Sequence, residues 1–353
     1  MKVSQVMLAK GFGGAERLFV DLCIYLSEAG LQVQAICITG SKSAQLLSRH
    51  PEVLLQTISV LGTWDPFAPF KIARLLKAHK TQVVQAHLAR GAILSGKACN
   101  KLGLPLVVTT HNYIDIKYYK HVSVLLPPTK HLRAYYLSKG IDADKLKIIN
   151  HFSPIEPEKI IVHNKRETIH ILALGRLVHK KGFHVLLDAF AKIQLEGSTH
   201  CELHIGGTGP EQQALLTQIR ALGLEDKVSL IGWVDDVASF LKEGDVFVLP
   251  SLDEPFGIVV LEAMAMGLPI VSMDSQGPKE ILDEDSAWLF TTGDSTSLAA
   301  TLQDACNNQD ERKRKGDNAL LRFKNKYSKQ AVIPEFMALY HSLVEEKTMP
   351  FQQ

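Results

Sequence analysis

The sequence predicts an α/β protein in which two doubly wound, Rossmann-like parallel sheets face a central cleft. The chain has 353 residues, which suits two domains of ordinary size. Short apolar runs alternate with segments of helical period, which is the pattern of βαβ units. The alternation pauses in a polar stretch at 153–168 and then begins again, so we expect each half of the chain to build its own sheet.

The expected strands are short, mostly apolar runs, because strands of a parallel sheet are buried on both faces. In the first half they are VSQVMLA (3–9), QVQAICITG (32–40), TQVVQAH (81–87) and PLVVTTH (105–111). In the second half they are IHILALG (169–175), CELHIGG (201–207), KVSLIGW (227–233), DVFVLP (245–250) and LPIVSMD (268–274). Helices are expected between them, for example at 15–30 and 90–103.

We expect domain boundaries near the polar stretch and near the end of the chain. The first domain would cover 1–160 and the second 161–328. A C-terminal helix at 329–353 would pack back toward the first domain. The segment ERKRKGDNALLRFKNK (311–326), which precedes it, is expected to be a basic, solvated stretch.

The composition indicates a cytoplasmic globular protein. Hydrophobic residues make up 46% of the chain and charged residues 22%, which is enough apolar surface for two cores. The five cysteines form no C-x-x-C pair, so the pattern disfavours a cysteine-based zinc or redox site. The N-terminal apolar run is too short for a signal peptide, and no stretch approaches the roughly 20 apolar residues of a membrane span.

The net charge of +2 conceals an asymmetry between the halves. Residues 1–160 hold 20 Lys and Arg against 10 Asp and Glu, a balance of +10, and the remainder holds 19 against 27, a balance of −8. A basic half suggests an anionic partner, such as a membrane surface, a phosphorylated substrate or nucleic acid. Nucleic acid is disfavoured, because the sequence contains no recognised DNA- or RNA-binding motif.

Glycine-rich turns follow two of the expected strands. Gly13 and Gly14 in KGFGGAER (10–17) lack a Cβ, so a phosphate could approach the backbone there. Gly207 in IGGTGPE (205–211) would line a nucleotide pocket in the same way. Plain βα turns also use glycine, so these loops alone do not establish a site.

A histidine follows the strand at 105–111. His111 would lie at the cleft, where its ring could bond a sugar hydroxyl or stabilise developing charge. His87 has a similar position after its own strand. A loop histidine with an ordinary structural role is the alternative for either residue.

Two cations follow the first strand of the second half. Arg176 can donate two hydrogen bonds to phosphate oxygens, and Lys181 supplies a point charge. Together on one βα loop they suit a diphosphate. The alternative is that Lys180 and Lys181 are simply a solvated run.

Two glutamates surround a Pro-Phe-Gly turn. Pro255 suits the first turn of a helix, which places Glu254 at its N-terminus beside the amides of Phe256, Gly257 and Ile258. Glu262 follows eight positions later, about two turns if the whole segment is helical. The two carboxylates would accept hydrogen bonds from paired hydroxyls, as on a sugar or ribose. A capping carboxylate plus a solvated glutamate is the alternative, although the apolar surroundings of Glu262 disfavour it.

The sequence predicts no metal site. IDAD (141–144) and DED (283–285) carry closely spaced carboxylates, but each is better explained as a polar turn.

Taken together, the Gly-rich first loop, GRLVHKKG (175–182), GGTGPE (206–211) and EPFGIVVLEAMAMGLPIV (254–271) resemble the retaining glycosyltransferases of family 4. The resemblance covers nearly the whole chain and is firmest in the second half. It implies the GT-B fold, with an acceptor-side N-terminal domain and a nucleotide-sugar donor domain. It also implies transfer of a hexose-type sugar with retention. No metal or other cofactor is implied, and the nucleotide sugar counts as a substrate.

The resemblance assigns roles to the candidate residues. Arg176 and Lys181 would hold the donor diphosphate, Glu254 the donor sugar at the reacting face, and Glu262 the ribose. The remaining donor contacts would come from Gly13, Gly14, His111, Gly207, Phe256, Gly257, Ile258 and Val259.

The chain departs from the family pattern at three places, one of which is the short stretch between His111 and the expected helix in PPTKHLRAYYLSKG (127–140). In SQGPKE (275–280), Gln276 stands where glycine is usual, and NHF (150–152) replaces the usual Asn-Gly. These departures affect the expected acceptor side more than the donor side.

We expect the acceptor to be a glycan or a lipid-linked, lipopolysaccharide-type molecule. The segment FKIARLLKAHK (70–80) places Lys71, Arg74 and Lys77 at roughly helical spacing, and aromatic residues accompany lysines further along. Such segments suit the inner face of an anionic membrane, and they equally suit ordinary solvated surfaces. Two other functions stay open: a sugar-nucleotide epimerase on the same fold, and a protein that binds a nucleotide sugar without turnover.

Overall fold

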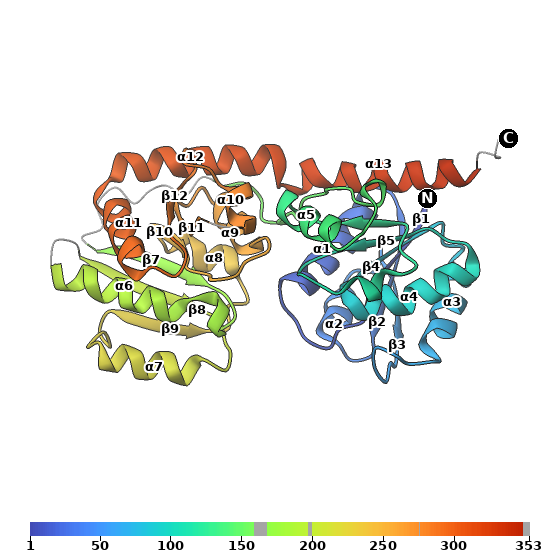
Figure 1. The fold of residues 1–353 in the computed structure, drawn as a ribbon, viewed down its shortest axis with the longest axis horizontal. Helices are drawn as coiled ribbons and strands as arrows, with labels where there is room; N and C mark the ends of the chain where they lie inside the picture. The colour runs from blue at the N-terminus through green and yellow to red at the C-terminus, as the bar shows by residue number, and fades with distance from the viewer. Residues whose placement is uncertain (159–167, 197–199, 275, 349–353) are drawn as a thin grey trace. The chain divides into compact units, whose positions relative to one another are not determined.

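The protein consists of two compact units, each built around one six-stranded parallel sheet (Figure 1). The computed structural model describes residues 1–158, 168–196, 200–274 and 276–348. Unit 1 comprises Met1–Phe152 and Lys329–Gln353, and unit 2 comprises Ser153–Ser328. The expected boundary at 160/161 lies outside the described residues.

Unit 1 alternates strands and helices and then receives the C-terminal helix. Its elements are β1 (Lys2–Met7), α1 (Gly14–Glu28), β2 (Gln32–Ile38), α2 (Lys42–Leu47), β3 (Leu54–Ile58), α3 (Ala68–His79), β4 (Val83–His87), α4 (Leu88–Leu102), β5 (Leu106–Thr109), η1 (Ile116–Tyr119), β6 (Val124–Leu126), α5 (Lys130–Ser138), η2 (Ala143–Lys145) and α13 (Lys329–Thr348). The strand order β3-β2-β1-β4-β5-β6 is that of a Rossmann sheet.

Unit 2 repeats this design. Its elements are β7 (Ile169–Leu174), η3 (His179–Lys181), α6 (Phe183–Glu196), β8 (Cys201–Gly206), α7 (Gln212–Ala221), β9 (Val228–Gly232), α8 (Val237–Lys242), β10 (Val246–Leu249), α9 (Ile258–Ala265), β11 (Ile270–Met273), α10 (Gln276–Ile281), β12 (Ala287–Phe290), α11 (Ser295–Asn307) and α12 (Gln309–Lys326). The order β12-β11-β10-β7-β8-β9 is the same Rossmann order, so the predicted fold class is confirmed.

Alternation along the strands of unit 2 builds a core on each face of its sheet. Ile171, Leu203 and Val248 face one way and pack with α6, α7 and α11. Leu172 and Phe247 face the other way and pack with α8, α9 and α12. Two-sided burial explains why these strands are continuous apolar runs in the sequence.

The segment 311–326 differs from its expectation. It belongs to α12, an 18-residue helix, rather than to a solvated stretch. Arg312 and Lys315 are buried. The Lys315 ammonium donates to the Ala287 carbonyl at the start of β12 (3.1 Å), and the Arg312 guanidinium donates to the Ala305 carbonyl (2.8 Å). Their aliphatic stems cover apolar surface while the charged ends satisfy backbone carbonyls.

A buried polar network joins the C-terminal helix to the sheet of unit 1. The hydroxyl of Tyr340 in α13 donates to Gln85 in β4 and accepts from Nε2 of Gln5 in β1 (3.0 Å). All three side chains are almost completely buried. Amides in the middle of a parallel sheet require such partners, because an unpaired buried polar group is costly.

Two general properties follow from the described residues. All five cysteines are buried as free thiols. No helix in the described part of the chain combines the length and the hydropathy needed to cross a membrane.

We predict that Tyr340→Phe lowers the free energy of unfolding by about 1–3 kcal/mol, because it leaves the Gln5 and Gln85 amides buried without their common partner. Urea denaturation followed by circular dichroism measures the change. Tyr135→Phe in α5 is the matched control, since that tyrosine is only partly buried. Equal stability of the two variants would contradict a stabilising role for the network.

Candidate active site

Each sheet has one point at which the strand order reverses. It lies between β1 and β4 in unit 1 and between β7 and β10 in unit 2. In doubly wound sheets, ligands bind outside the carboxyl ends of the strands at this point, because the connections on either side leave toward opposite faces. The loops after these four strands are therefore the places to examine.

In unit 2, Lys181 and Glu254 form an ion pair at this reversal point. The Lys181 ammonium, at the end of η3, contacts a carboxylate oxygen of Glu254, which follows β10. Their side chains are only 17% and 11% exposed. Desolvation offsets most of the attraction in such a pair, so its main effect is to fix the orientation of both groups.

Close backbone contact holds the two loops that carry this pair. Gly182 has a φ of +67°, and a Cβ there would lie 2.0 Å from the Pro250 carbonyl oxygen. The Leu252 amide donates to the Lys180 carbonyl (2.8 Å). Glycine is required at this position both for its conformation and for the approach of the neighbouring chain.

A third loop fixes Glu254 from the other side. The Gln276 side-chain oxygen accepts from the Glu254 amide (2.9 Å), and the Gly277 amide donates to the Glu254 carbonyl (3.2 Å). Gln276 adopts a φ of +49°, in the left-handed region that glycine usually occupies. The glutamine that departs from the family pattern therefore keeps the glycine-like backbone and adds a hydrogen bond to the site.

The prediction for the start of the following helix is wrong. We expected Pro255 in the first helical turn, but α9 begins at Ile258. Gly257, at a φ of +98°, redirects the chain just before the helix. The residues from Glu254 to Gly257 thus form a turn, and Glu254 and Glu262 are not separated by two turns of continuous helix.

The other candidates around α9 have the following positions. Phe256 is buried in the core beneath the turn. Ile258 and Val259 form the first turn of α9, where backbone amides are available to an anion. Glu262 is buried inside α9.

Arg176 and Gly207 lie on adjacent loops of unit 2. Arg176, directly after β7, has an exposed side chain, and no ion pair to it occurs among the described residues. A Cβ on Gly207, which has a φ of +135°, would lie 1.8 Å from the Gly175 carbonyl oxygen. Gly207 therefore allows the loops after β7 and β8 to pack backbone against backbone.

In unit 1, Gly13 and Gly14 form the turn between β1 and α1. Gly13 precedes the helix with an extended φ of −161°, which any residue adopts. A Cβ there would meet only the Glu16 carboxylate, at an ordinary 3.6 Å. Neither conformation nor packing within unit 1 requires glycine at this position.

His111 belongs to a cluster of three buried imidazoles in unit 1. Its ring stacks on His87 of β4 (5.6 Å between centroids) and lies against His151 (4.8 Å). Burial lowers the pKa of all three rings, that of His111 to about 3, so they are neutral at physiological pH.

Hydrogen bonds connect this cluster to the network around Tyr340. Nε2 of His87 donates to the side-chain oxygen of Gln5 (3.2 Å), since the Gln5 amide nitrogen already donates to Tyr340. His87 Nδ1 is then an acceptor, and His111 Nε2 donates to it (3.4 Å). This arrangement leaves Nδ1 of His111 as the acceptor of that ring.

The structure adds two residues to the candidate site that sequence analysis did not assign to it. In the sequence they stood out only because they depart from the family pattern. His151 comes from NHF, where Asn-Gly is usual, and Gln276 comes from SQGPKE. Nothing in their local sequence indicates a partner, because His111 and Glu254 are far from them in the chain.

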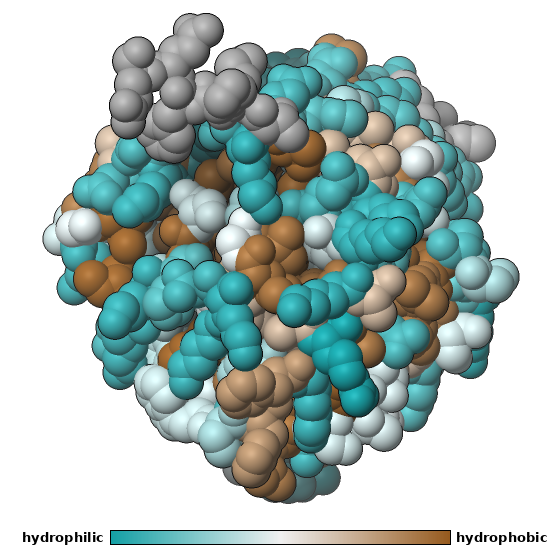
Figure 2. All heavy atoms as spheres, turned by 90° about the vertical axis from the view of Figure 1, so that its right-hand side faces the viewer, coloured by the Kyte–Doolittle hydropathy of each residue, from teal (hydrophilic) through white to brown (hydrophobic). Residues whose placement is uncertain are grey.

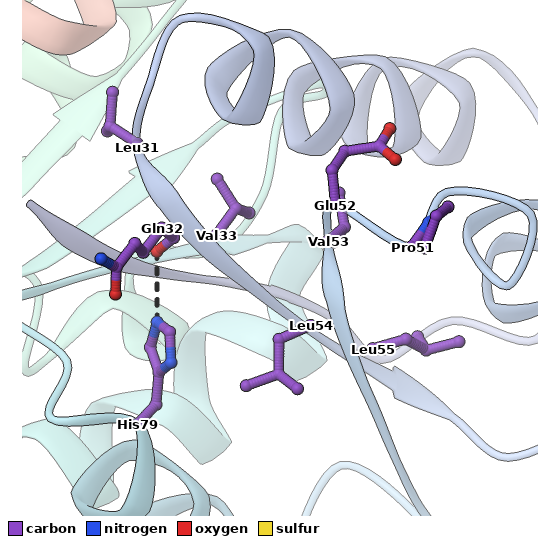
Figure 3. A pocket seen from close by; sticks show the side chains of 9 residues that line it. All are labelled: Leu31, Gln32, Val33, Pro51, Glu52, Val53, Leu54, Leu55 and His79. Carbon is purple, nitrogen blue, oxygen red and sulfur yellow. Dashed lines mark hydrogen bonds between the residues drawn. The ribbon is translucent and has the colours of Figure 1, made fainter.

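One hollow of unit 1 lies away from these loops. It has a volume of about 420 Å³ and is lined by the amino ends of β2 and β3 together with His79 (Figure 3). The His79 ring faces the Gln32 carbonyl, 3.2 Å from Nε2. Because ligands of such sheets bind at the opposite, carboxyl ends of the strands, we assign this hollow no catalytic role.

Two Rossmann-ordered units with glycine-rich loops at the reversal points are the architecture of the GT-B fold. Comparison with solved structures supports this: the HepE protein of Anabaena, crystallised with UDP and glucose, superposes with a TM-score of 0.83. It is 20% identical, and the match covers 97% of this chain and 100% of HepE.

Sequence comparisons identify the family. The model for "Glycosyl transferases group 1" matches residues 156–322, and that for "Glycosyltransferase Family 4" matches 12–153. The chain belongs to this family of glycosyltransferases.

Two relatives from Rhizobium meliloti match over nearly their full length. The lipopolysaccharide core biosynthesis glycosyltransferase LpsE is 25% identical over 97% of this chain and 99% of its own. The corresponding protein LpsD is 24% identical, over 93% and 95%.

We predict that the free energy of unfolding decreases as the pH falls below about 6.5. The reason is that the buried histidines have lower pKa values in the folded state than in the unfolded state. The unfolded chain then binds more protons, which costs up to about 1.4 kcal/mol per pH unit for each histidine. The stabilisation from the neutral histidines is fully present above pH 6.5. It is lost as the pH falls from there toward the pKa values that these histidines have in the folded state.

Urea midpoints at pH 7.5, 6.0 and 5.0 test this prediction. His151→Gln removes one titrating ring and should flatten the pH dependence, whatever its effect on stability at pH 7.5. His341→Gln, at an exposed position in α13, should keep the wild-type slope. Parallel slopes for all three proteins would show that the histidine cluster does not determine the acid sensitivity.

Proposed function

We propose that this chain is a retaining glycosyltransferase that moves a hexose-type sugar from a nucleotide diphosphate sugar to a lipopolysaccharide-type or lipid-linked glycan. The observation that supports this most is the Lys181–Glu254 pair at the reversal point of the unit 2 sheet. It presents a cation for a diphosphate and a carboxylate for sugar hydroxyls from two adjoining loops.

The negative charge that develops on the leaving diphosphate explains the roles we propose for these residues. When the bond between the anomeric carbon and the diphosphate oxygen breaks, negative charge grows on the leaving group. Lys181, the exposed guanidinium of Arg176 and the amides of Ile258 and Val259 would stabilise it, so the protein supplies this function without a metal. Glu254 would hold the donor sugar, and the buried Glu262 would bind the ribose hydroxyls.

We propose that retention results from attack on the same face that the leaving group occupies. The acceptor hydroxyl would form the new bond to the anomeric carbon as the old one breaks, and its proton would pass to the departing diphosphate oxygen. His111, held by its bond to His87, would offer Nδ1 to a donor hydroxyl. Gly13 and Gly14 would admit the phosphates close to the backbone.

The names of the relatives support the acceptor class. LpsE and LpsD are both described as acting in lipopolysaccharide core biosynthesis, and they align with this chain almost from end to end. HepE was crystallised with UDP and glucose, which are a nucleotide and a hexose of the kind proposed here.

We predict that Glu254→Ala lowers kcat for sugar transfer by at least about 100-fold, because a sugar contact is lost and Lys181 is left without its partner. The measurement is nucleotide diphosphate release from UDP-, GDP- and ADP-sugars, with membrane extract as acceptor. Asp253→Ala is the matched control: this neighbouring acid pairs with Lys180 at 3.7 Å and is about 40% exposed.

The products distinguish the competing functions. Nucleotide release from one donor together with a glycosylated acceptor supports a transferase. Nucleotide release without an acceptor product would indicate an epimerase. Donor binding without turnover would indicate a binding protein, and equal activity of the Glu254→Ala variant would reject the assigned site.

We also propose that the enzyme works at the cytoplasmic face of a membrane containing anionic lipid. Four large apolar side chains of unit 1, between β3 and the first turn of α3, are 62–90% exposed: Leu61, Trp64, Phe67 and Phe70. Brown and teal side chains mingle on the side of the molecule where α3 lies (Figure 2).

Two lysines lie near these apolar side chains. Lys101 Nζ lies 5.0 Å from the centre of the Phe70 ring, and Lys117 Nζ lies 5.2 Å from that of Tyr118, which neighbours Trp64. Aromatic rings beside ammonium groups are suited to the headgroup region of an anionic bilayer, because the rings enter the apolar boundary while the cations meet lipid phosphate.

We predict that the wild-type protein floats with vesicles of anionic lipid more than with neutral ones. Trp64→Ser with Phe67→Ser should lower the bound fraction several-fold, since each buried aromatic contributes about 1.5–3 kcal/mol. Leu321→Ser, at a 59% exposed position of α12 in unit 2, is the control. No preference for anionic lipid would count against membrane binding.

A further inference from the structure

Three potential metal ligands lie side by side on the sheet of unit 2. His170 is the second residue of β7, and Glu202 and His204 are the second and fourth of β8. His170 is directly opposite Glu202 in the parallel register. Glu202 and His204 are two positions apart, so all three side chains project from the same face of the sheet.

This face is only partly covered. It is the face of Leu172 and Phe247, whose core with α8 and α9 lies over the other strands. Over β8 and β9 the face is more open: Ile231, in the edge strand β9, is 49% exposed, and the side chains of His204 and Glu202 are 23% and 37% exposed. The three ligands are therefore accessible to an ion from solvent and retain room to rotate.

The distances are close to those of a coordination sphere. One ligand atom from each residue lies within 4.8 Å of the others, and His204 Nε2 is 3.9 Å from a Glu202 oxygen. Tetrahedral Zn²⁺, with bonds of about 2.0–2.2 Å, places its ligands about 3.3–3.5 Å apart. Small side-chain rotations of partly exposed residues would close the difference.

We propose that His170, Glu202 and His204 bind one divalent transition-metal ion of the zinc class. Two imidazoles and one carboxylate are ligands that Zn²⁺ prefers, and they would leave a fourth position for water. Calcium and magnesium, which favour all-oxygen ligands, fit this set poorly.

This site is separate from the proposed sugar-transfer site. Its residues lie in the body of β7 and β8, whereas Arg176, Lys181 and Gly207 lie on loops beyond the carboxyl ends of the strands. The ion would connect two neighbouring strands of unit 2 and stabilise their pairing. The proposal does not depend on the reaction that the enzyme performs.

Equilibrium dialysis of the full chain against Zn²⁺, with metal quantified by mass spectrometry, tests the site. We expect the wild-type protein to bind one Zn²⁺ ion. Each of the variants His170→Ala, Glu202→Gln and His204→Ala should lower the affinity for that ion by at least about tenfold. Co²⁺ should give the intense visible absorption of a four-coordinate site in wild type and not in these variants. Thermal unfolding should shift upward with Zn²⁺ in wild type only.

The control is another histidine–glutamate pair, His50 and Glu52, which lie 3.0 Å apart on the surface of unit 1. Substituting alanine for both should leave Zn²⁺ binding and the Co²⁺ spectrum unchanged. Absence of stoichiometric binding to wild type would overturn the proposal. So would Zn²⁺ affinity that survives substitution at His170 and His204, because the ion would then bind elsewhere.

Discussion

Close backbone contacts at glycine hold the loops of unit 2 together, and the positions of its candidate site depend on them. Gly182 meets Pro250, Gly207 meets Gly175, and a Cβ on Gly277 would lie 2.4 Å from the Pro255 carbonyl oxygen. Each contact joins a loop to that of a neighbouring strand, so the cation after β7 and the carboxylate after β10 become partners. A methyl group at any of these glycines would force the loops apart, because the atoms it meets belong to backbone rather than to flexible side chains.

The buried polar groups of the two units have different consequences. In unit 1, the chain of hydrogen bonds from Tyr340 through Gln5 and His87 to His111 satisfies groups that would otherwise destabilise the sheet. It also fixes the tautomer of a ring at the carboxyl edge. In unit 2, the Lys181–Glu254 pair gains little stability from its charges. Its value lies in orientation, which is what a site needs when it must stabilise charge that develops only during reaction.

The sequence predicted the central strands well and the edges poorly. The strands it missed, β3, β6 and β12, all lie at sheet edges and have only three to five residues. Strands this short contain too few residues to show a clear period, although β6 and β12 are mostly buried. Segment 311–326 was misjudged because its charges conceal a helix in which Arg312 and Lys315 donate to buried carbonyls. The Pro255 error has a similar origin, since the conformation of Gly257 was not evident from its neighbours.

The sequence by itself determined the fold class, the family and the residue types of the donor loops, because these depend on local periodicity and on motifs that are continuous in the chain. Only the tertiary structure decided which of those residues meet. Glu254 is fixed by Gln276, His111 lies between His87 and His151, and His170 joins Glu202 and His204 across two strands. These partners are separated by tens of residues, and strand order and register bring them together. A one-residue change of register would turn a side chain to the other face of the sheet, so such contacts cannot be inferred from spacing along the chain.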